Sequence, residues 1–295
     1  MTGRRTAGEA PHPMVDIPTE QRARPRVPRN PLLDGIRIGN LEVRLARGAA
    51  DVHALQALRY RVFYEEMAAQ PTPAMRAARR DFDDFDEFCD HVLVLDHGDG
   101  GRRPSVVGTY RLLLRSRVPP GAQFYTAGEY DISRLLELDG EMVELGRSCV
   151  DARYRSGAAI QILLRAIGAY VAYHDCVAMF GCASLPGVDV AAAADQLSYL
   201  YHRHLAPADI RPRALPERYT EMNRVASAAL DEKRALATLP PLVKGYLRAG
   251  CKIGDGAVVD HQFQTIDVCV VLRTDLVSEK YRSRYEYSAD EAPRQ

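Results

Sequence analysis

Residues 141–183 constrain the fold of this chain more than any other segment. Residues 141–150 have the apolar composition of a buried strand, residues 157–173 repeat apolar side chains at helical spacing, and residues 176–183 form a second short apolar strand. Two strands joined by one helix are typical of a parallel crossover, which places both strands in the same sheet. The sequence therefore predicts an α/β fold.

The first of these strands contains residues that can perform chemistry. Glu144 is a charge inside an apolar run, where it must be paired or becomes costly. Glu144 and Arg147 lie three residues apart, so both reach one site only if an extra residue forms a β-bulge, which is least strained at Gly146. The freed amides could stabilise an oxyanion, and a buried carboxylate could accept a proton from an amine. This pattern indicates direct acyl transfer.

Further charged residues interrupt apolar elements elsewhere in the chain. Arg59 and Phe63 share a face of a predicted helix, Asp83 and Asp86 lie in an acidic loop, and Arg111 lies within a predicted strand. Each of them alone is typical of a solvated face or a surface ion pair. Together they indicate one site, in which the aspartates either orient the arginines or attract a cationic substrate.

The rest of the pattern is that of a mixed sheet flanked by helices. Strands are predicted over residues 41–45, 91–95, 105–114 and 265–272, and helices over residues 51–67, 189–205 and 240–248. A glycine-rich turn at residues 97–101 connects two of these strands, so we expect a hairpin there.

A Pro- and Arg-rich arm precedes the predicted domain. Residues 1–38 lack apolar periodicity, which predicts a disordered arm, followed by one domain over residues 39–295. The arginines of the arm could contact an anionic membrane surface or an acidic partner, and a solvated tail is the simpler alternative.

Composition narrows the functional classes. The net charge is zero, which excludes a general attraction to nucleic acid. There is no run of about 18 apolar residues, and the N-terminus lacks the pattern of a secretory signal. These features predict a cytoplasmic protein, and peripheral contact with the inner membrane is the alternative that the basic arm leaves open.

Other candidate groups are weaker. The six cysteines form no C-x-x-C pair, so reduced thiols are expected rather than disulfides or a zinc site. His202 and His204 are two residues apart on a predicted helix and point in different directions, so no metal site is expected. Cys149 has no base placed for it by the sequence and is predicted to be a packed thiol. Glu141 is the main competitor of Glu144 for the role of base.

These residues carry a resemblance to two related families. The set Arg59-x-x-x-Phe63, Asp83-x-x-Asp86, Arg111 and Glu144-x-x-Arg147 resembles the charged residues of acyl-homoserine-lactone synthases, which belong to the acetyltransferase (GNAT) superfamily. Residues 240–248 (Pro-Pro-Leu-Val-Lys-Gly-Tyr-Leu-Arg), 253–257 (Ile-Gly-Asp-Gly-Ala) and 260–263 (Asp-His-Gln-Phe) instead resemble the bacterial ornithine lipid acyltransferases. The resemblance covers about residues 41 to 275, and the late block is its more specific half.

The second resemblance implies transfer of a 3-hydroxyacyl chain from acyl carrier protein to the α-amino group of L-ornithine, the first step of ornithine lipid synthesis. It implies a GNAT-type mixed sheet and a direct attack of the amine on the thioester. The alternatives are an acyl-homoserine-lactone-type signal synthase and a non-catalytic scaffold that binds acylated carrier protein. The predicted site residues are Glu144, Gly146 and Arg147 for catalysis, and Arg59, Phe63, Asp83, Asp86 and Arg111 for substrate binding.

The turn before the helix at residues 157–173 bears on the acyl donor. Acetyltransferases that use coenzyme A usually hold its pyrophosphate on an Arg-x-x-Gly-x-Gly/Ala turn at a helix N-terminus. Residues 155–160 here read Arg-Ser-Gly-Ala-Ala-Ile. Ala158 and Ile160 stand where small, glycine-like residues are expected, so a pyrophosphate could approach the backbone amides less closely. Acyl carrier protein presents one phosphate and an acidic surface, which suits this turn. The predicted donor-binding residues are Arg153, Arg155, Ser156 and Gly157, and no further cofactor is expected.

Overall fold

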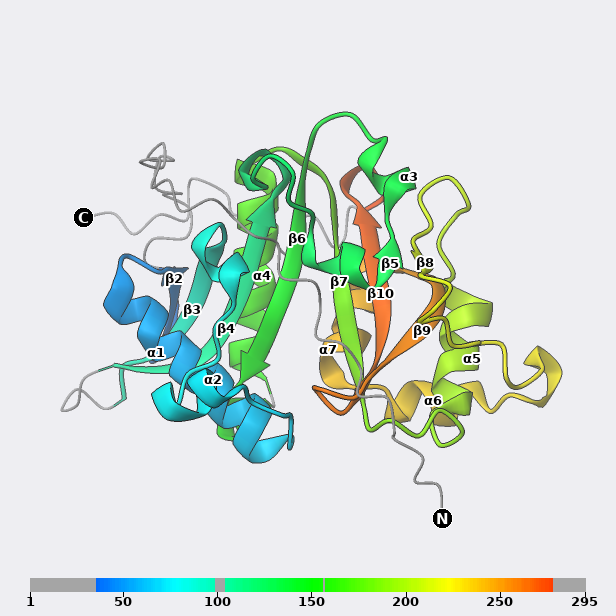
Figure 1. Cartoon of the computed structure of the whole chain (residues 1–295), viewed down its shortest axis with the longest axis horizontal. Coiled ribbons are helices and arrows are strands. Elements are labelled where there is room, and N and C mark those ends of the chain that lie inside the picture. The colour runs from blue at the N-terminus through cyan, green and yellow to red at the C-terminus, as the bar shows by residue number, and fades with distance from the viewer. Residues whose placement is uncertain (1–35, 99–103, 156, 278–295) are drawn as a thin grey trace, which may run out of the picture.

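One ten-stranded mixed sheet organises the chain (Figure 1). The computed structural model describes residues 36–98, 104–155 and 157–277. The strands are β1 (Ile36–Ile38), β2 (Leu41–Leu45), β3 (Asp90–Asp96), β4 (Ser105–Leu114), β5 (Tyr130–Asp131), β6 (Glu141–Val150), β7 (Cys176–Pro186), β8 (Arg213–Ala214), β9 (Lys252–Asp260) and β10 (Thr265–Arg273). Their order in the sheet is β1-β2-β3-β4-β6-β7-β10-β9-β8-β5.

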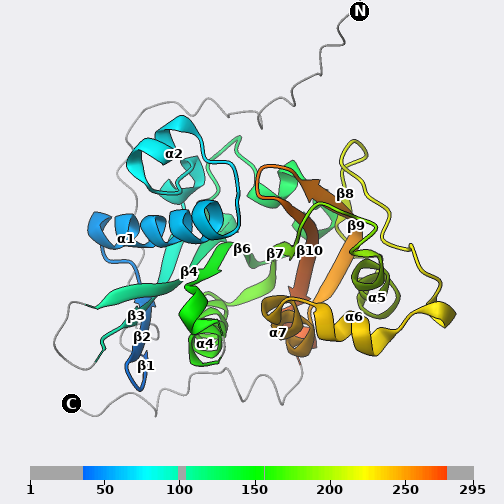
Figure 2. The same ribbon diagram turned by 90° about the horizontal axis from the view of Figure 1, so that it is seen from below.

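Seven helices flank this sheet within the described residues. They are α1 (Ala49–Tyr60), α2 (Pro73–Ala78), α3 (Ser133–Leu136), α4 (Ala158–Tyr173), α5 (Ala194–His204), α6 (Glu232–Thr238) and α7 (Pro241–Ala249). Figure 2 shows α1 and α2 on one side of the strands β2 to β6, and α4 and α7 on the opposite side. The main core lies between the sheet and α4, where Ile162 and Ala166 are fully buried against strand residues such as Leu112 and Val143.

The strand pairing confirms the topology predicted from the sequence. β3 and β4 form the expected antiparallel hairpin. β6 and β7 are parallel and are joined by α4, as the crossover pattern predicts. In this sheet only β6–β7 and β8–β9 pair in parallel among the described residues. The prediction of a mixed sheet flanked by helices is therefore confirmed.

Several boundaries differ from the prediction for local reasons. The helix predicted over residues 51–67 is α-helical only to Tyr60 and continues as a π-helical segment over Arg61–Glu66. α5 starts five residues later than predicted, because the Asp189 carboxylate accepts the amides of Ala191 and Ala192 and holds a turn there. β9 was not predicted, since its two glycines weaken a strand pattern.

The ends of the chain lie mostly beyond the described residues. Residues 1–35 of the predicted arm are outside them, and residues 36–38 already form the edge strand β1, so the sheet begins inside the predicted boundary. In the described ranges, no helix has the length and apolar character needed to cross a membrane.

Candidate active site

The pocket lies where two parallel strands separate. β6 and β7 pair from Glu141 to Glu144, and beyond that point the described strands diverge, as Figure 1 shows. Gly181 sits at the divergence, where an added Cβ would lie 2.2 Å from the carbonyl oxygen of Leu145. The space between the diverging strands, which we call the wedge, opens into a pocket of about 590 Å³ that is lined by residues of both strands. The unpaired edge of β6 therefore faces this pocket.

A bulge brings Glu144 and Arg147 to the same site. Residues three apart on a regular strand point to opposite faces, so such a bulge was required. Thr109 pairs with Cys149 and Arg111 pairs with Gly146, so β6 has one residue more than β4 between these pairs. The left-handed φ of +49° falls on Arg147, and not on Gly146 as expected. A Cβ on Gly146 would lie 3.7 Å from Arg111 Nε, which is an ordinary contact. The predicted position of the strained residue was therefore wrong by one.

The strain at Arg147 is offset by the surroundings of its guanidinium group. A non-glycine residue in the left-handed region is unusual and persists where the structure around it holds it. The guanidinium lies 5.0 Å from the ring centre of Tyr125 and 4.9 Å from that of Phe263. It also donates to Asp83 at 2.9 Å. A glycine at this position would relax the backbone and lose all of these contacts.

Glu144 is buried in the wall of the pocket. Its two carboxylate oxygens accept the backbone N–H groups of Thr126 at 2.6 Å and Tyr125 at 3.0 Å. Burial raises the pKa of Glu144 above the ordinary value, and the hydrogen bonds from Thr126 and Tyr125 partly oppose this shift. The carboxylate is therefore held in place by amides and is more basic than an exposed glutamate.

A network of arginines and aspartates stands behind the pocket. Arg59 and Asp81 are completely buried, and Arg111 is 4% exposed. The ion pairs join Arg59 to Asp81 (2.6 Å) and Asp86 (2.7 Å), Arg111 to Asp83 and Asp86 (3.0 Å), and Arg147 to Asp83 (2.9 Å). Buried charges of opposite sign that share hydrogen bonds hold one another in fixed positions.

The structure divides the predicted substrate-binding residues into two groups. Phe63 and Arg111 line the pocket, whereas Arg59, Asp83 and Asp86 lie behind the lining residues. Both aspartates are already engaged by arginines, which favours the first alternative from the sequence, that they orient these arginines. They are therefore poorly placed to attract a cationic substrate.

The predicted donor residues lie at the end of β6 and the start of α4. Arg155 lines the pocket, donates to the Val150 carbonyl oxygen at 2.9 Å and pairs with Glu66. The Arg153 side chain is 75% exposed and pairs with Asp151. Gly157, at a φ of +115°, precedes the first turn of α4 and provides no side-chain cap, and Ser156 is outside the described residues. Gly157 thus leaves the first amides of α4 without a cap from its own position.

The competing groups do not fit the pocket as well. Glu141 is at the far end of β6, away from the pocket lining, and accepts the Met142 and Ser116 amides. Cys149 lines the pocket, but burial raises the pKa of its thiol far above the ordinary value, so it is a packed thiol. His202 and His204 contact different groups, the Val225 carbonyl and the Tyr199 hydroxyl.

Sequence reasoning missed several residues of this region. Asp81 accepts Arg59 and the Tyr64 hydroxyl at 2.8 Å, although it lies only two residues before the predicted Asp83. Asp260 and Asp267 line the pocket from β9 and β10. Asp267 stands inside an apolar strand, which is the same signal that pointed to Glu144.

Comparison with known proteins assigns the family. A model described as an acetyltransferase (GNAT) domain matches residues 58–165. The L-ornithine N(alpha)-acyltransferase of Agrobacterium fabrum is 46% identical over 258 residues, which cover 86% of this chain and 88% of that protein. The enzyme of the same name from Rhizobium meliloti is 45% identical and covers 84% of this chain and 85% of its own length. The chain belongs to the L-ornithine N(alpha)-acyltransferase family.

Family membership confirms the resemblance seen in the sequence and the GNAT-type fold, and it makes this chain an acyltransferase. Among solved structures, an N-acyl amino acid synthase from uncultured soil microbes aligns with a TM-score of 0.46 and 8% identity, covering 82% of this chain and 97% of its own. The acyl-homoserine-lactone synthase LasI aligns with a TM-score of 0.40 and 12% identity, covering 78% of this chain and 89% of its own.

Proposed function

We propose that this chain transfers a 3-hydroxyacyl group from acyl carrier protein to the α-amino group of L-ornithine, as the first step of ornithine lipid synthesis. The observation that carries this proposal is the pocket between β6 and β7, which combines a buried carboxylate, an unpaired strand edge and a bulge. The names of the relatives support ornithine as the acceptor. The acyl carrier and the 3-hydroxy group rest on the resemblance described above.

In the proposed mechanism the amine attacks the thioester directly. Glu144, acting through a water molecule, accepts the proton that the α-ammonium group must lose to become an attacking amine. Backbone amides of β6 near Gly146 and Arg147 stabilise the oxyanion of the tetrahedral intermediate. A C–N bond forms, the C–S bond breaks, and the carrier thiolate leaves and takes up a proton. Arg59, Asp83 and Asp86 act by positioning Arg111 and Arg147.

The turn before α4 supports a carrier-protein donor. Ile160 occupies the wall of the pocket close to the first turn, where coenzyme A-dependent enzymes use a small residue. Arg155 lines the pocket, and the exposed Arg153 lies two residues before it; they pair with Glu66 and Asp151 and present their guanidinium groups beside this turn. An acidic carrier domain with a single phosphate matches these features better than a nucleotide pyrophosphate.

An apolar cavity offers space for the acyl chain. A second cavity of about 520 Å³ lies between α4, α7 and the strands β7 and β10, and it shares Leu164 and Tyr246 with the first pocket. Ile167, Val171 and Leu272 contribute apolar side chains to it. We place the acyl chain in this cavity. The product is amphipathic, and we propose that a cytoplasmic enzyme in peripheral contact with the inner membrane releases it there.

A reconstituted reaction tests the proposal. Purified protein is mixed with 3-hydroxyacyl carrier protein and L-ornithine, and the products are analysed by mass spectrometry. We expect an N-acylornithine and free carrier thiol in equal amounts. An acyl-homoserine lactone as the product would indicate a signal synthase, and binding of acyl carrier protein without turnover would indicate a scaffold. Either result would contradict the proposal.

A further inference from the structure

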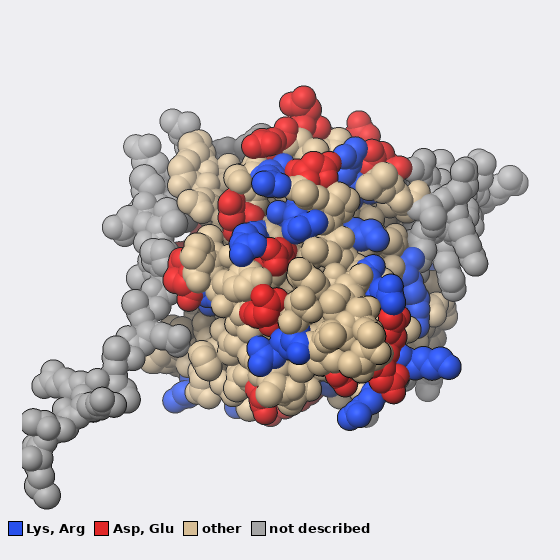
Figure 3. Space-filling view, turned by 90° about the vertical axis from the view of Figure 1, so that its right-hand side faces the viewer, with Lys and Arg blue, Asp and Glu red and all other residues tan. Residues whose placement is uncertain are grey.

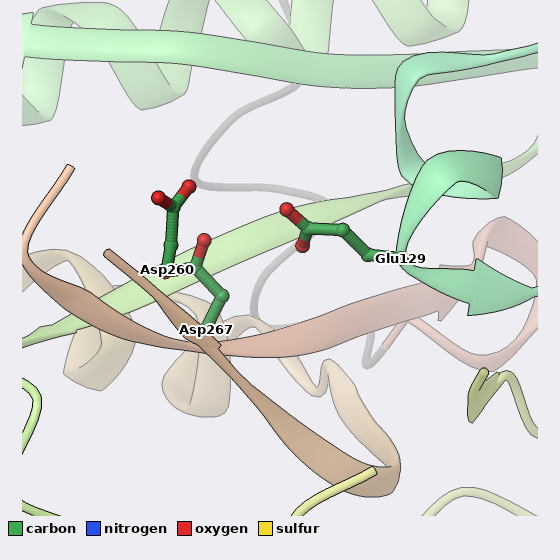
Figure 4. Close-up of side chains that lie close together, drawn as sticks. All are labelled: Glu129, Asp260 and Asp267. Carbon is green, nitrogen blue, oxygen red and sulfur yellow. The ribbon is translucent and has the colours of Figure 1, made fainter. Parts of the chain in front are cut away.

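Three buried carboxylates converge beside the pocket, separate from the ion pairs of the arginine network. Glu129, Asp260 and Asp267 are exposed by 0%, 5% and 6%, and they come from the segment before β5, the end of β9 and the start of β10. Their carboxylate oxygens lie within 4.8 Å of one another, and Figure 4 shows the three groups turned toward a common space. We call these three residues the carboxylate triad.

The triad forms no ion pair with a described residue. None of its members takes part in a described ion pair, in contrast to Asp81, Asp83 and Asp86. Glu129 Oε1 and Asp267 Oδ1 are buried and have no hydrogen-bond partner. The charge of Arg218 acts on Glu129 and Asp267, but its guanidinium donates to the Gly128 carbonyl at 3.0 Å and forms no ion pair with either. Burying unpaired carboxylates is costly, so the unpartnered oxygens point to a cation that binds between them.

The position of the triad connects it to the proposed reaction. Asp260 and Asp267 line the same pocket as Glu144. Glu129 follows directly after the short helix Tyr125–Gly128, whose first amides bind Glu144. The segment Tyr125–Glu129 therefore contacts Glu144 through its amides and supplies a member of the triad, so one substrate in the pocket can contact both.

The donor and acceptor geometry favours an ammonium group. A primary ammonium has three N–H donors and no acceptor, which matches three carboxylates arriving from three directions. A calcium ion prefers six to eight oxygen ligands. In addition, the Gln262 and Phe263 amides already donate to Asp260 Oδ1 at 2.7 and 2.9 Å, which occupies lone pairs that a metal would use.

We propose that Glu129, Asp260 and Asp267 bind the δ-ammonium group of the ornithine acceptor and thereby select a diamino acid. This assignment rests on the proposed function for the identity of the acceptor. It leaves the α-amino group near Glu144 as the nucleophile, because the δ-nitrogen stays protonated and hydrogen-bonded between the carboxylates.

Calorimetric binding of two amino acids tests the assignment. L-ornithine and L-norvaline share a carbon skeleton, and norvaline lacks the δ-amino group. Both are titrated into the full-length protein in the presence of EDTA. We expect ornithine to bind about 10- to 100-fold more tightly than norvaline, and Asp267→Asn to remove this difference while leaving the weak norvaline binding unchanged.

Two further variants keep the test decisive. Asp255→Asn makes the same chemical change on β9, at a residue paired with the exposed Arg213 and outside the pocket lining, and it should bind ornithine like the wild type. Glu129→Gln alters the triad from another element and should reproduce Asp267→Asn. Thermal melts verify that each variant folds. If Asp267→Asn is unfolded, the ornithine and norvaline affinities of Glu129→Gln provide the test.

Several results would overturn the assignment. Equal ornithine affinity in the wild type and both triad variants would do so. Binding of Mg²⁺ or Ca²⁺ that depends on the triad, with no discrimination between ornithine and norvaline, would make the triad a metal site instead. Triad-dependent ornithine binding without acylation would contradict the proposed function alone, whereas acylation with triad-independent binding would contradict this assignment alone.

Discussion

Acidic side chains lie on two sides of the pocket, and their neighbours give them different roles. Burial opposes the ionisation of Asp83 and Asp86, but the adjacent arginines outweigh it and lower the pKa of both carboxyls. Burial raises the pKa of Glu129 and Asp267, which face no arginine in a described ion pair. The first pair therefore fixes arginine positions, and the second can receive a cation.

The role of Glu144 as a base is testable by one isosteric change. Glu144→Gln keeps the shape of the side chain but cannot accept a proton, so we expect kcat to fall by about 10² to 10⁴-fold with the fold intact. Glu141→Gln is the matched control on the same strand, and its kcat should remain near the wild-type value. Steady-state kinetics with saturating substrates measure both. The opposite ranking of these two variants would transfer the role of base to Glu141.

The arginine network makes a prediction about stability and pH. Asp86→Asn removes one partner of the buried Arg59 and should lower the free energy of unfolding at neutral pH by about 3 kcal/mol. The pKa of Asp86 is lower in the folded state than its ordinary value of about 3.8, which we take for the unfolded chain. The ionised carboxylate therefore stabilises the fold at any pH above that value. That contribution declines as the pH falls below the unfolded value and is fully lost once the pH has fallen through the folded pKa.

The variant should therefore lose less stability than the wild type between neutral pH and about pH 3. Urea denaturation at both pH values measures the difference, with the exposed Asp84→Asn as the control that should match the wild type. Equal acid sensitivity of Asp86→Asn and wild type would contradict the role given to this ion pair.

At the scale of elements, the alternation of side chains along a strand predicted an irregularity in β6. It required a bulge between Glu144 and Arg147, and the structure has the bulge directly after Gly146, at Arg147 and Ser148. The exact residue with a positive φ could not be predicted, because ring contacts from Tyr125 and Phe263, distant in sequence, hold Arg147 in that conformation. The divergence of β6 from β7 was also invisible, since it depends on pairing between strands.

The candidate site was predictable only in part for the same reason. Glu144 and Arg111 stand out as charges within apolar strands, and this signal is local. Asp267 carries the same signal and was not considered, while Glu129 lies in a connection with no distinguishing pattern. The packing of β9 and β10 beside the segment before β5 assembles the triad, and no short-range pattern reports such packing.

Two glycines test the geometry of the wedge. Gly181→Ala places a Cβ against the Leu145 carbonyl oxygen, so we expect a loss of about 1 to 3 kcal/mol in unfolding free energy from overpacking. Gly146→Ala makes only an ordinary contact with Arg111 and should change stability by less than about 0.5 kcal/mol. Chemical denaturation of both variants gives the comparison. A loss for Gly181→Ala as small as that for Gly146→Ala would mean that Gly181 does not lie this close to the Leu145 carbonyl.

At the scale of the whole molecule, the α/β class, the hairpin and the crossover followed from apolar periodicity. The ten-stranded order did not, because it joins strands far apart in the chain, such as β7 and β10. Figure 3 shows basic and acidic side chains interspersed over the face that carries α5 and α6. This face therefore offers a mixed surface, and we expect the acidic carrier protein to approach near Arg153 and Arg155 instead.

Docking of the donor can be tested by charge reversal. Arg153→Glu should lower kcat/KM for acyl carrier protein about tenfold, and the remaining rate should depend less on salt. Arg203→Glu on α5 is the matched control, because its exposed side chain also pairs with a carboxylate and lies on the mixed face. Donor competition adds a check, in which acyl carrier protein should exceed the matching acyl-coenzyme A in kcat/KM. Similar values for the two donors would argue against a carrier-protein donor.

The position of the acyl group on ornithine tests the central claim most directly. In the proposed arrangement the carboxylate triad holds the δ-ammonium group and Glu144 receives the proton of the α-nitrogen, so the α-nitrogen attacks the thioester. Tandem mass spectrometry of the product formed by the purified enzyme distinguishes the two nitrogens. We predict that the acyl group is found on the α-nitrogen alone. A product acylated on the δ-nitrogen, or an equal mixture, would contradict this orientation of the substrate.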